Sequence, residues 1–287
     1  MTALFKMPDI CVPPPAMQRA RGTGRLAVKH ADGAHRLDRL FQEGAARIRL
    51  PRVARGAPLE AVLINTAGGL TGGDRMAWQA MLGEGTAASL TTQACEKIYK
   101  AVDATPATVS VHLDLAAQAA LAWLPQETIL FERASLSRHI EVDMAAGVRL
   151  LMVEPLVFGR RAMGEAISVV RFQDRWRIRS QGRLIHAEDF AIGPDAAPVL
   201  SAPVGLGGAT AFATVLLVAP DADRHLEAVR RLIGTTGGAS AWRISSSTSG
   251  KLLARLSAAD SYDLRKILVP LIRLLNPQAG LPKVWSL

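Results

Sequence analysis

From residue 24 to about residue 220, apolar and polar side chains alternate along this 287-residue chain. Successive side chains of a β-strand point to opposite faces, so the alternation indicates strands with one buried face. Glycine and proline interrupt the pattern about every ten residues, which is typical of a β-sandwich, a barrel or a solenoid. We expect one hairpin over residues 167–185, turning at Gln173-Asp174. The rows expected to face inward are Met76, Trp78, Ala80 and Leu82; Val109, Val111, Leu113 and Leu115; and Ile140, Val142 and Met144.

Two helices are expected, both near the end of the chain. The first spans about residues 223–233, with Asp223 as its N-cap and Gly234 in a left-handed conformation after its last residue. The second spans about residues 258–275 and begins with a capping box, Ser257-x-x-Asp260. Its apolar stripe is formed by Leu264, Ile267, Leu268, Leu271 and Leu275, with Pro270 expected to kink the helix.

These patterns divide the chain into a tail and one domain. Residues 1–22 form the tail, and residues 23–287 form a single, mainly β domain. Within it, we expect a β-rich body over about residues 23–220 and an α+β element over about residues 221–287. No linker or repeat requires a second domain.

Composition limits the location of the protein. Hydrophobic residues make up 49% of the chain and the mean hydropathy is +0.17, but charges interrupt every stretch of the roughly 18 residues that a spanning helix needs. The N-terminus carries Lys6 and Asp9 and has no apolar signal-peptide region. Cys11 and Cys95 are too few for a disulfide framework. We therefore expect a cytoplasmic protein. Its apolar excess indicates either a large core or a surface that a partner covers.

The net charge is +9, and residues 1–60 alone supply +6 of it. A basic region of this kind is suited to nucleic acid or to an acidic protein. Because no basic motif interleaved with aromatic residues is present, a nucleic-acid-binding module is kept only as an alternative.

No local motif predicts a tight metal or nucleotide site. The six histidines show no ligand spacing, and the glycine-dense segment Gly68–Asp74 lacks the lysine and hydroxyl of a phosphate loop. Its glycines are better explained by a tight corner with positive φ, which places Asp74 at a constrained, partly buried turn. Cys95 has no histidine near it in sequence, which favours a structural role.

Several carboxylates lie inside apolar segments. Glu127 and Glu132 flank one such segment, and Glu154 lies within another, with Arg160 and Arg161 as expected partners. Two interpretations stay open: structural ion pairs, or polar groups that line an internal water-filled passage. An enzyme that uses Glu127 and Glu132 on a carbohydrate is a further alternative. Aromatic residues make up only 5% of the chain, which argues against a sugar-binding site.

Five blocks of sequence, in the same order, resemble motifs of the urease accessory protein family UreD, also called UreH. They are the glycine corner Ala67–Asp74; Thr91–Lys100, with Lys97, Tyr99 and Lys100 at its end; Leu121–Glu127, which runs on to Phe131; Glu154–Arg160 with Met163-Gly164-Glu165; and Pro282–Trp285. The chain departs from the family pattern at Cys95-Glu96, and it has lysine instead of arginine at Lys100 and Lys283. Residues 1–22 match nothing in the family.

The resemblance implies a β-helix-like stack of strands with two helices, and a scaffold without catalytic activity. It implies binding to UreF, recruitment of the GTPase UreG and docking on apo-urease, with a possible dimer of such heteromeric complexes. No tightly bound cofactor is expected, because nickel would pass only transiently through water-filled tunnels.

The resemblance also assigns roles to particular residues. The implied nickel-path candidates are Asp74, Glu154 and Glu165. Candidates for an interface or for support of the fold are Lys97, Tyr99, Arg160, Leu268 and Leu271, the last two on the expected C-terminal helix.

Overall fold

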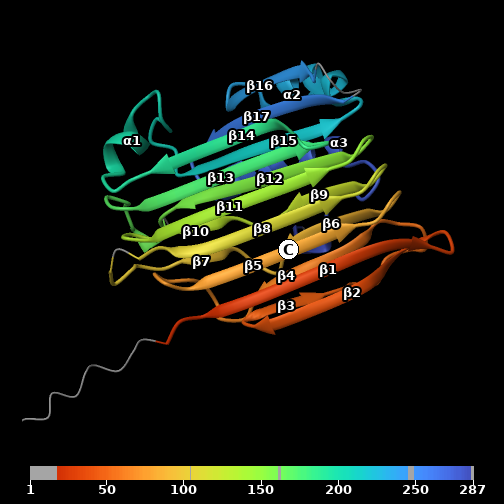
Figure 1. The fold of residues 1–287 in the computed structure, drawn as a ribbon. Helices are drawn as coiled ribbons and strands as arrows, with labels where there is room; N and C mark the ends of the chain where they lie inside the picture. Colours follow the sequence, from red (N-terminus) through yellow and green to blue (C-terminus); the bar gives the residue numbers. More distant parts are fainter. Residues whose placement is uncertain (1–17, 104, 161–162, 245–248, 286–287) are drawn as a thin grey trace, which may run out of the picture.

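The chain folds into a β-solenoid of about four turns, in which two sheets lie face to face around a common core (Figure 1). The computed structural model describes residues 18–103, 105–160, 163–244 and 249–285. Cys11, Arg161 and most of the predicted tail lie outside these ranges. The first strand begins at Arg21, two residues inside the range predicted for the tail.

Sheet A has seven strands and sheet B has ten. Sheet A contains, in spatial order, β14 (Arg183–Ile192), β13 (Arg171–Ser180), β11 (Ser135–Met144), β8 (Ala107–Leu115), β5 (Arg75–Leu82), β1 (Arg21–Ala31) and β2 (Ala34–Gly44). Sheet B contains β16 (Gly237–Arg243), β17 (Gly250–Ala258), β15 (Ala211–Ala219), β12 (Arg149–Phe158), β9 (Ala120–Leu124), β6 (Ala87–Thr92), β4 (Leu59–Asn65) and β3 (Ala46–Arg49). In addition, β10 (Thr128–Leu130) pairs with β12, and β7 (Glu96–Ile98) pairs with β10.

The chain passes back and forth between the sheets, so that successive solenoid strands of one sheet, such as β5, β8 and β11, are parallel and in register. The strands that flank them at the sheet ends, such as β2 and β14, pair antiparallel. Trp78 of β5 lies beside Val111 of β8, which lies beside Ile140 of β11. Such inward rows, repeated along each strand, fill the space between the sheets with apolar side chains. The expectation of a mainly β, β-helix-like body is confirmed, and so are the inward rows around Trp78, Val111 and Ile140.

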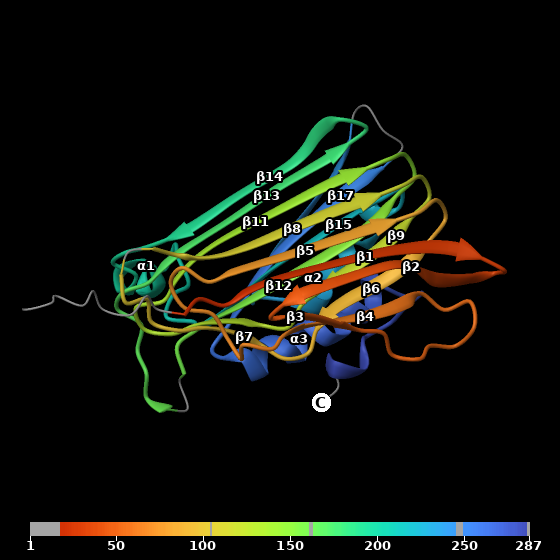
Figure 2. The ribbon, with the colours of Figure 1, turned by 60° about the horizontal axis from the view of Figure 1, so that its bottom comes forward.

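The outer faces of the two sheets differ. Strands of sheet A alternate between buried and exposed residues, whereas nearly every residue of β12 and β15 is buried. The difference arises because α2 (Leu226–Ile233) and α3 (Ser261–Leu275) cover sheet B (Figure 2). They form a second apolar core with it.

The two C-terminal helices were predicted, but their starts were not. A 3-10 turn, Ala222–His225, precedes α2, and Asp223 pairs with Arg243 (2.9 Å) instead of capping the helix. Helix α3 is capped by Asp260, which accepts from the backbone N–H of Asp263 (2.9 Å). The predicted capping box is wrong because Ser257 belongs to β17.

The predicted hairpin turn is also wrong. Gln173 and Asp174 lie inside β13, and the turn falls at Gln181-Gly182. Two short elements were not expected from the sequence: α1 (Ala197–Ser201) and the 3-10 turn Lys283–Trp285. Among the described residues, no helix is long and apolar enough to cross a membrane.

Candidate functional site

Sheet B is interrupted on one side of β12. The segment Pro125–Glu127 separates β9 from β10, although both strands pair with β12 in parallel. A second break, at residues 93–95, separates β6 from β7 at the same level. Because the ladder opens there, side chains near the breaks can bond to groups on either side of the sheet.

A buried charge cluster lies inside the solenoid, next to these breaks. Arg138 of β11 donates from Nε and Nη2 to the two carboxylate oxygens of Asp174 (2.9 and 2.5 Å) and from Nη1 to Glu154 (2.5 Å). Trp123 Nε1 donates to the other oxygen of Glu154 (2.6 Å). Asp174 is 4% exposed and Glu154 is 3% exposed. One buried cation therefore serves two buried carboxylates and joins sheet A to sheet B.

Glu154 is the carboxylate of this cluster whose ionisation is most affected by burial. Removal from water raises the pKa of Glu154 above its usual range, and the neighbouring Asp174 adds to the rise while Arg138 opposes it. Arg160 and Arg161 were the expected partners of the carboxylates; for Glu154 the cation is Arg138 instead, and Arg161 lies outside the described residues. Arg160 instead donates from Nε to Glu165 (2.9 Å).

A cavity of about 50 Å³ lies against this cluster, lined by Glu154, Arg138 and Thr128 among others. It is large enough for ordered water, since one water needs roughly 10–15 Å³ of such space. A second hollow, of about 180 Å³, lies nearer the surface; the exposed residues Gly68 and Lys97 and the buried Gly69 are among those that line it. The residues that line both hollows are Leu63, Trp78, Thr92 and Glu96.

Glu96 is the one carboxylate among the residues shared by these two hollows. Its Oε1 accepts a hydrogen bond from Asn65 Nδ2 (3.0 Å). Burial raises the pKa of Glu96 to about 7, and the bond from Asn65 opposes the rise. Near neutral pH this carboxyl group is therefore only partly ionised.

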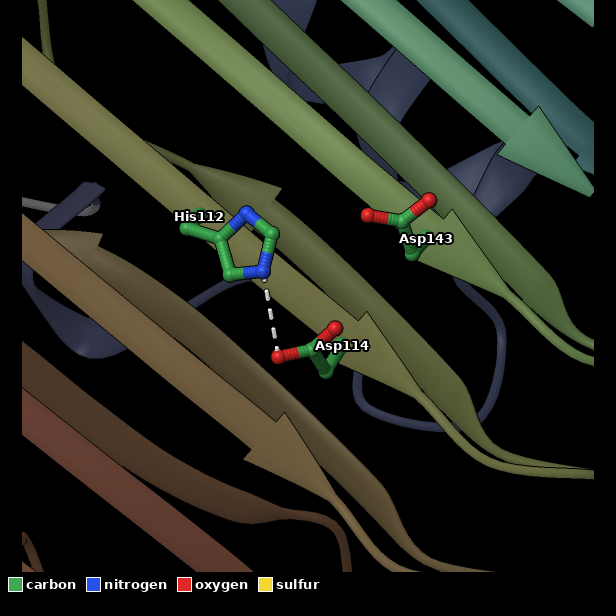
Figure 3. Close-up of side chains that lie close together, drawn as sticks. All are labelled: His112, Asp114 and Asp143. Carbon is green, nitrogen blue, oxygen red and sulfur yellow. Dashed lines mark ion pairs between the residues drawn. The ribbon is translucent and has the colours of Figure 1, made fainter. Parts of the chain in front are cut away.

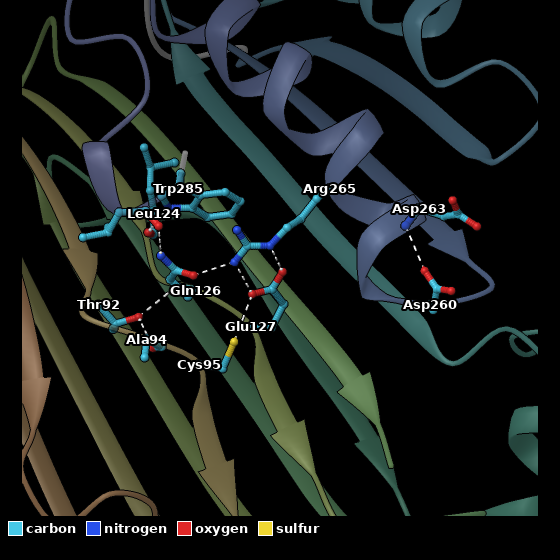
Figure 4. A network of polar contacts seen from close by, with 11 residues as sticks. Thr92, Ala94, Cys95, Leu124, Gln126, Glu127, Asp260, Asp263, Arg265 and Trp285 are labelled. Carbon is cyan, nitrogen blue, oxygen red and sulfur yellow. Dashed lines mark hydrogen bonds and ion pairs between the residues drawn. The ribbon is translucent and has the colours of Figure 1, made fainter. Parts of the chain in front are cut away.

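A second polar cluster lies on the other side of sheet B, under α3 (Figure 4). Arg265 of α3 donates to both oxygens of Glu127 (2.6 and 2.7 Å), and Cys95 Sγ lies 3.3 Å from Glu127 Oε2. Burial opposes the charge of Glu127, but the bonds from Arg265 outweigh it and lower the pKa of the carboxyl. Burial and the charge of Glu127 raise the pKa of Cys95 to about 12, so the thiol stays protonated near neutral pH.

The C-terminal segment closes this second cluster. Trp285 Nε1 donates to the carbonyl oxygen of Leu124 (3.0 Å), and Gln126 Nε2 donates to that of Val284 (2.7 Å). The guanidinium of Arg265 lies over the Trp285 ring, 5.2 Å from its centroid. Two of the sequence blocks, around Leu121–Glu127 and Pro282–Trp285, are therefore joined in space and hold α3 against sheet B.

Of the three nickel-path candidates, only Glu154 lines a described cavity. Asp74 is 4% exposed and accepts from the backbone N–H groups of Ala20 and Thr71 (2.8 Å each), which fixes the glycine corner. The buried turn expected for Asp74 is confirmed. Glu165 is occupied by Arg160 and by the backbone N–H of Glu132 (3.2 Å).

The remaining candidates divide between surface and core. Lys97 is exposed at the outer hollow. Tyr99 packs edge-on against Phe131, with ring centroids 5.2 Å apart, and Arg160 covers the same ring at 4.5 Å. Leu268 and Leu271 were expected to serve an interface or the fold. Both are completely buried in the second core, so they support the fold.

Sequence reasoning missed Arg138, Asp174, Glu96 and Arg265. Two of them carried a usable signal: Arg138 stands in the inward row Leu136, Arg138, Ile140, and Asp174 in the row Phe172, Asp174, Trp176. A charge in a row that is otherwise apolar indicates a buried, paired group. The carbohydrate alternative finds no support, because Glu127 is bound to Arg265 while Glu132 accepts from the backbone N–H of Ser168 (2.7 Å).

Comparison with known proteins gives a consistent result. The profile of the family described as UreD urease accessory protein matches residues 20–286. The chain is 55% identical over 274 residues to urease accessory protein UreD of Mesorhizobium japonicum, covering 96% of each chain. It is 53% identical over 272 residues to urease accessory protein UreD 1 of Brucella ovis, covering 95% of this chain and 96% of that protein. For UreD 1 of Brucella anthropi the identity is 52% over 273 residues, covering 94% and 95%.

Proposed function

The chain belongs to the UreD urease accessory protein family, and from this premise we propose that its solenoid gives Ni²⁺ a path during urease maturation. Proteins of this family are non-catalytic scaffolds of urease maturation. The proposed path enters at the outer hollow beside Gly68 and Lys97, passes Glu96 and reaches the inner cavity at Glu154.

The observation that carries this proposal is the position of Glu96 at the junction of the two hollows. A hydrated cation that enters the outer hollow first meets this carboxylate and the carbonyl-rich glycine corner around Gly68 and Gly69. The next carboxylate inward is Glu154. A cation that follows this path would therefore meet oxygen donors one after another. In this proposal, Glu96 replaces Asp74 and Glu165, which the family resemblance implied as path residues.

A conduit must bind its cargo weakly, and the interior chemistry meets this requirement. Arg138 already neutralises part of the charge of Glu154 and Asp174, so a cation in the cavity gains little extra electrostatic stabilisation. The Cys95 thiol is protonated and bonded to Glu127, so it offers no thiolate that would trap nickel. Oxygen donors with retained water are suited to transient binding.

We further propose that this protein works in the cytoplasm with UreF, UreG and apo-urease, and that two such heteromeric complexes can pair. The apolar stripe of α3 is buried and does not supply the contact surface. Exposed apolar groups lie instead on the outer face and edge of sheet A, where Leu40, Phe41 and Met81 line a hollow of about 570 Å³ with Arg25 and Arg39. A partner that covers this area would remove apolar surface from water.

The test is urease activation in cells that co-express the urease subunits and all accessory proteins with variants of this chain. Glu96→Leu places an apolar side chain at the junction of the hollows, and we expect urease with a strongly reduced nickel content. Size-exclusion chromatography with light scattering, on the complex purified from the same cells, measures whether this chain still assembles with UreF and UreG. Glu84→Leu, at an exposed turn, is the matched control.

Two results would refute the path. Urease from the Glu96→Leu strain with its full nickel content would show that ions do not pass Glu96. A loss of the accessory complex in this variant, with a normal complex in the control, would show that Glu96 serves an interface. If the wild-type chain forms no complex with UreF, the proposed partnership is wrong.

A further inference from the structure

Four ligand-type side chains form a square on the outer face of sheet A. His112 and Asp114 are two residues apart on β8, and Glu141 and Asp143 occupy the directly opposite positions on β11. Because side chains alternate along a strand, all four point away from the core, while their neighbours such as Leu113 point into it. Figure 3 shows His112, Asp114 and Asp143 converging above the two strands.

The distances within the square suit a metal ion. His112 Nε2 lies 3.2 Å from Asp114 Oδ2, and one ligand atom from each of His112, Asp114 and Asp143 lies within 4.8 Å of the others. Adjacent ligands of an ion with bonds of about 2.1 Å are about 3 Å apart in an octahedral arrangement. The His112–Asp114 pair already has this spacing. A rotation of the Asp143 side chain would bring its oxygen closer to them.

The two aspartates are placed unfavourably for a sheet without a bound cation. Asp114 and Asp143 face each other directly, and like charges in this arrangement destabilise a sheet. Arg179 of β13 is the next residue in the same row, yet no ion pair joins it to Asp143 in the part of the chain that the structure describes. The ion pair recorded for Asp114 is with His112, which is charged only when protonated.

We propose that His112, Asp114 and Asp143 form an exchangeable surface site for a first-row divalent transition-metal ion. One imidazole nitrogen with two carboxylates suits Ni²⁺, Co²⁺ or Zn²⁺ better than Mg²⁺ or Ca²⁺, which take all-oxygen sites. Glu141, whose Oε2 lies 4.0 Å from His112 Nδ1, orients the imidazole or adds a fourth donor.

The openness of the site makes binding reversible. The side chains of His112 and Asp114 are 37% and 43% exposed, so water completes the coordination and the ion can leave. Sheet A separates the site from the cavity at Glu154, because the two lie on opposite faces of β11 and β8. The proposed surface site can therefore be tested independently of the proposed nickel path.

The experiment titrates the purified full-length chain with NiCl2, ZnCl2 and MgCl2 by isothermal titration calorimetry. We expect saturable binding of Ni²⁺ and Zn²⁺ and no comparable binding of Mg²⁺. His112→Ala and Asp143→Asn should each weaken Ni²⁺ binding by about tenfold or more, because each removes one of three protein ligands. His139→Ala and Glu84→Gln, at exposed positions outside the square, should leave it unchanged.

Two further measurements test whether His112 binds the metal ion and whether Asp114 and Asp143 repel each other in its absence. X-ray absorption of the nickel-loaded chain should show one imidazole, which is absent in His112→Ala. The metal-free Asp143→Asn variant should melt at a slightly higher temperature than wild type, because it removes a like-charge contact. Equal nickel affinity in wild type and His112→Ala, or a lower melting temperature of metal-free Asp143→Asn, would overturn the proposal.

Discussion

Sheet A and sheet B belong to the same solenoid, but their polar side chains differ in how far they are exposed to water. The parallel strands of sheet A have one face in water, although parallel sheets are usually covered on both sides. Sheet B is covered on its outer face by α2 and α3. On sheet A, exposed ion pairs such as Arg175–Asp189 need no further support. Around sheet B, polar groups such as Glu127 and Glu154 are buried and each has a specific cation.

The sequences of the strands record this difference. The central strands of sheet A alternate, as in Arg75–Leu82, whereas β12 and β15 are nearly continuous apolar runs. A single charge in such a run, as at Glu154, is therefore more informative than a charge on sheet A. The comparison predicts that equal substitutions will have unequal effects on the two sheets.

The largest effect is expected under α3, where the outer face of sheet B is covered. Leu268→Asp places a charge in a fully buried apolar site and should cost more than about 4 kcal/mol, enough to prevent folding. Soluble yield and thermal melting measure the effect. Tyr262→Asp, on the same helix but 69% exposed, is the control and should fold normally. A soluble, cooperatively melting Leu268→Asp would mean that α3 does not stay on sheet B.

The second effect is expected where the two sheets are joined by charge. Arg138→Met leaves Glu154 and Asp174 buried without their cation and should lower the free energy of unfolding by about 3–5 kcal/mol at pH 7. The deficit should shrink as the pH falls, because burial already favours the protonated form of Glu154. Urea unfolding at several pH values measures both.

The matched control for Arg138→Met is Arg175→Met on the outer face of sheet A. Its ion pair with Asp189 is about half exposed on both sides, so the expected loss is about 0–1 kcal/mol. If the two variants lose similar stability, the distinction between the covered and the solvated groups is wrong.

The smallest effect concerns Glu96 and depends on pH. Its folded-state pKa is raised to about 7 from 4.5, so the folded chain holds a proton that the unfolded chain releases. The free energy of unfolding should therefore fall as pH rises from about 4.5 to about 7. Glu96→Gln should remove this dependence, gaining about 1–3 kcal/mol at pH 8 and nothing at pH 4.

Glu84→Gln, at an exposed turn, controls for the loss of a negative charge. Thermal melting of the three chains between pH 4 and pH 8 is the measurement. Parallel pH profiles for wild type and Glu96→Gln would show that Glu96 is solvated, and would remove one support for the internal path.

Local sequence determined the elements of this protein. Alternation identified the strands, the glycine corner identified the turn that Asp74 holds, and the amphipathic pattern identified α2 and α3. These features depend on neighbouring residues, so the local pattern contains them. Helix starts were less predictable, because Ser257 and Asp260 are both capable caps and the end of β17 decided between them.

Only the tertiary structure decided which polar groups meet. Arg138, Glu154 and Asp174 come from three successive strands, and the lateral register of the solenoid brings them together. Gln126 reaches Val284 across 158 residues, and His112 meets Asp143 from the next turn. Such contacts depend on the length and shape of every intervening corner, which no single segment encodes. The sequence could mark Arg138 as a charge in an apolar row, but its partners followed from the register alone.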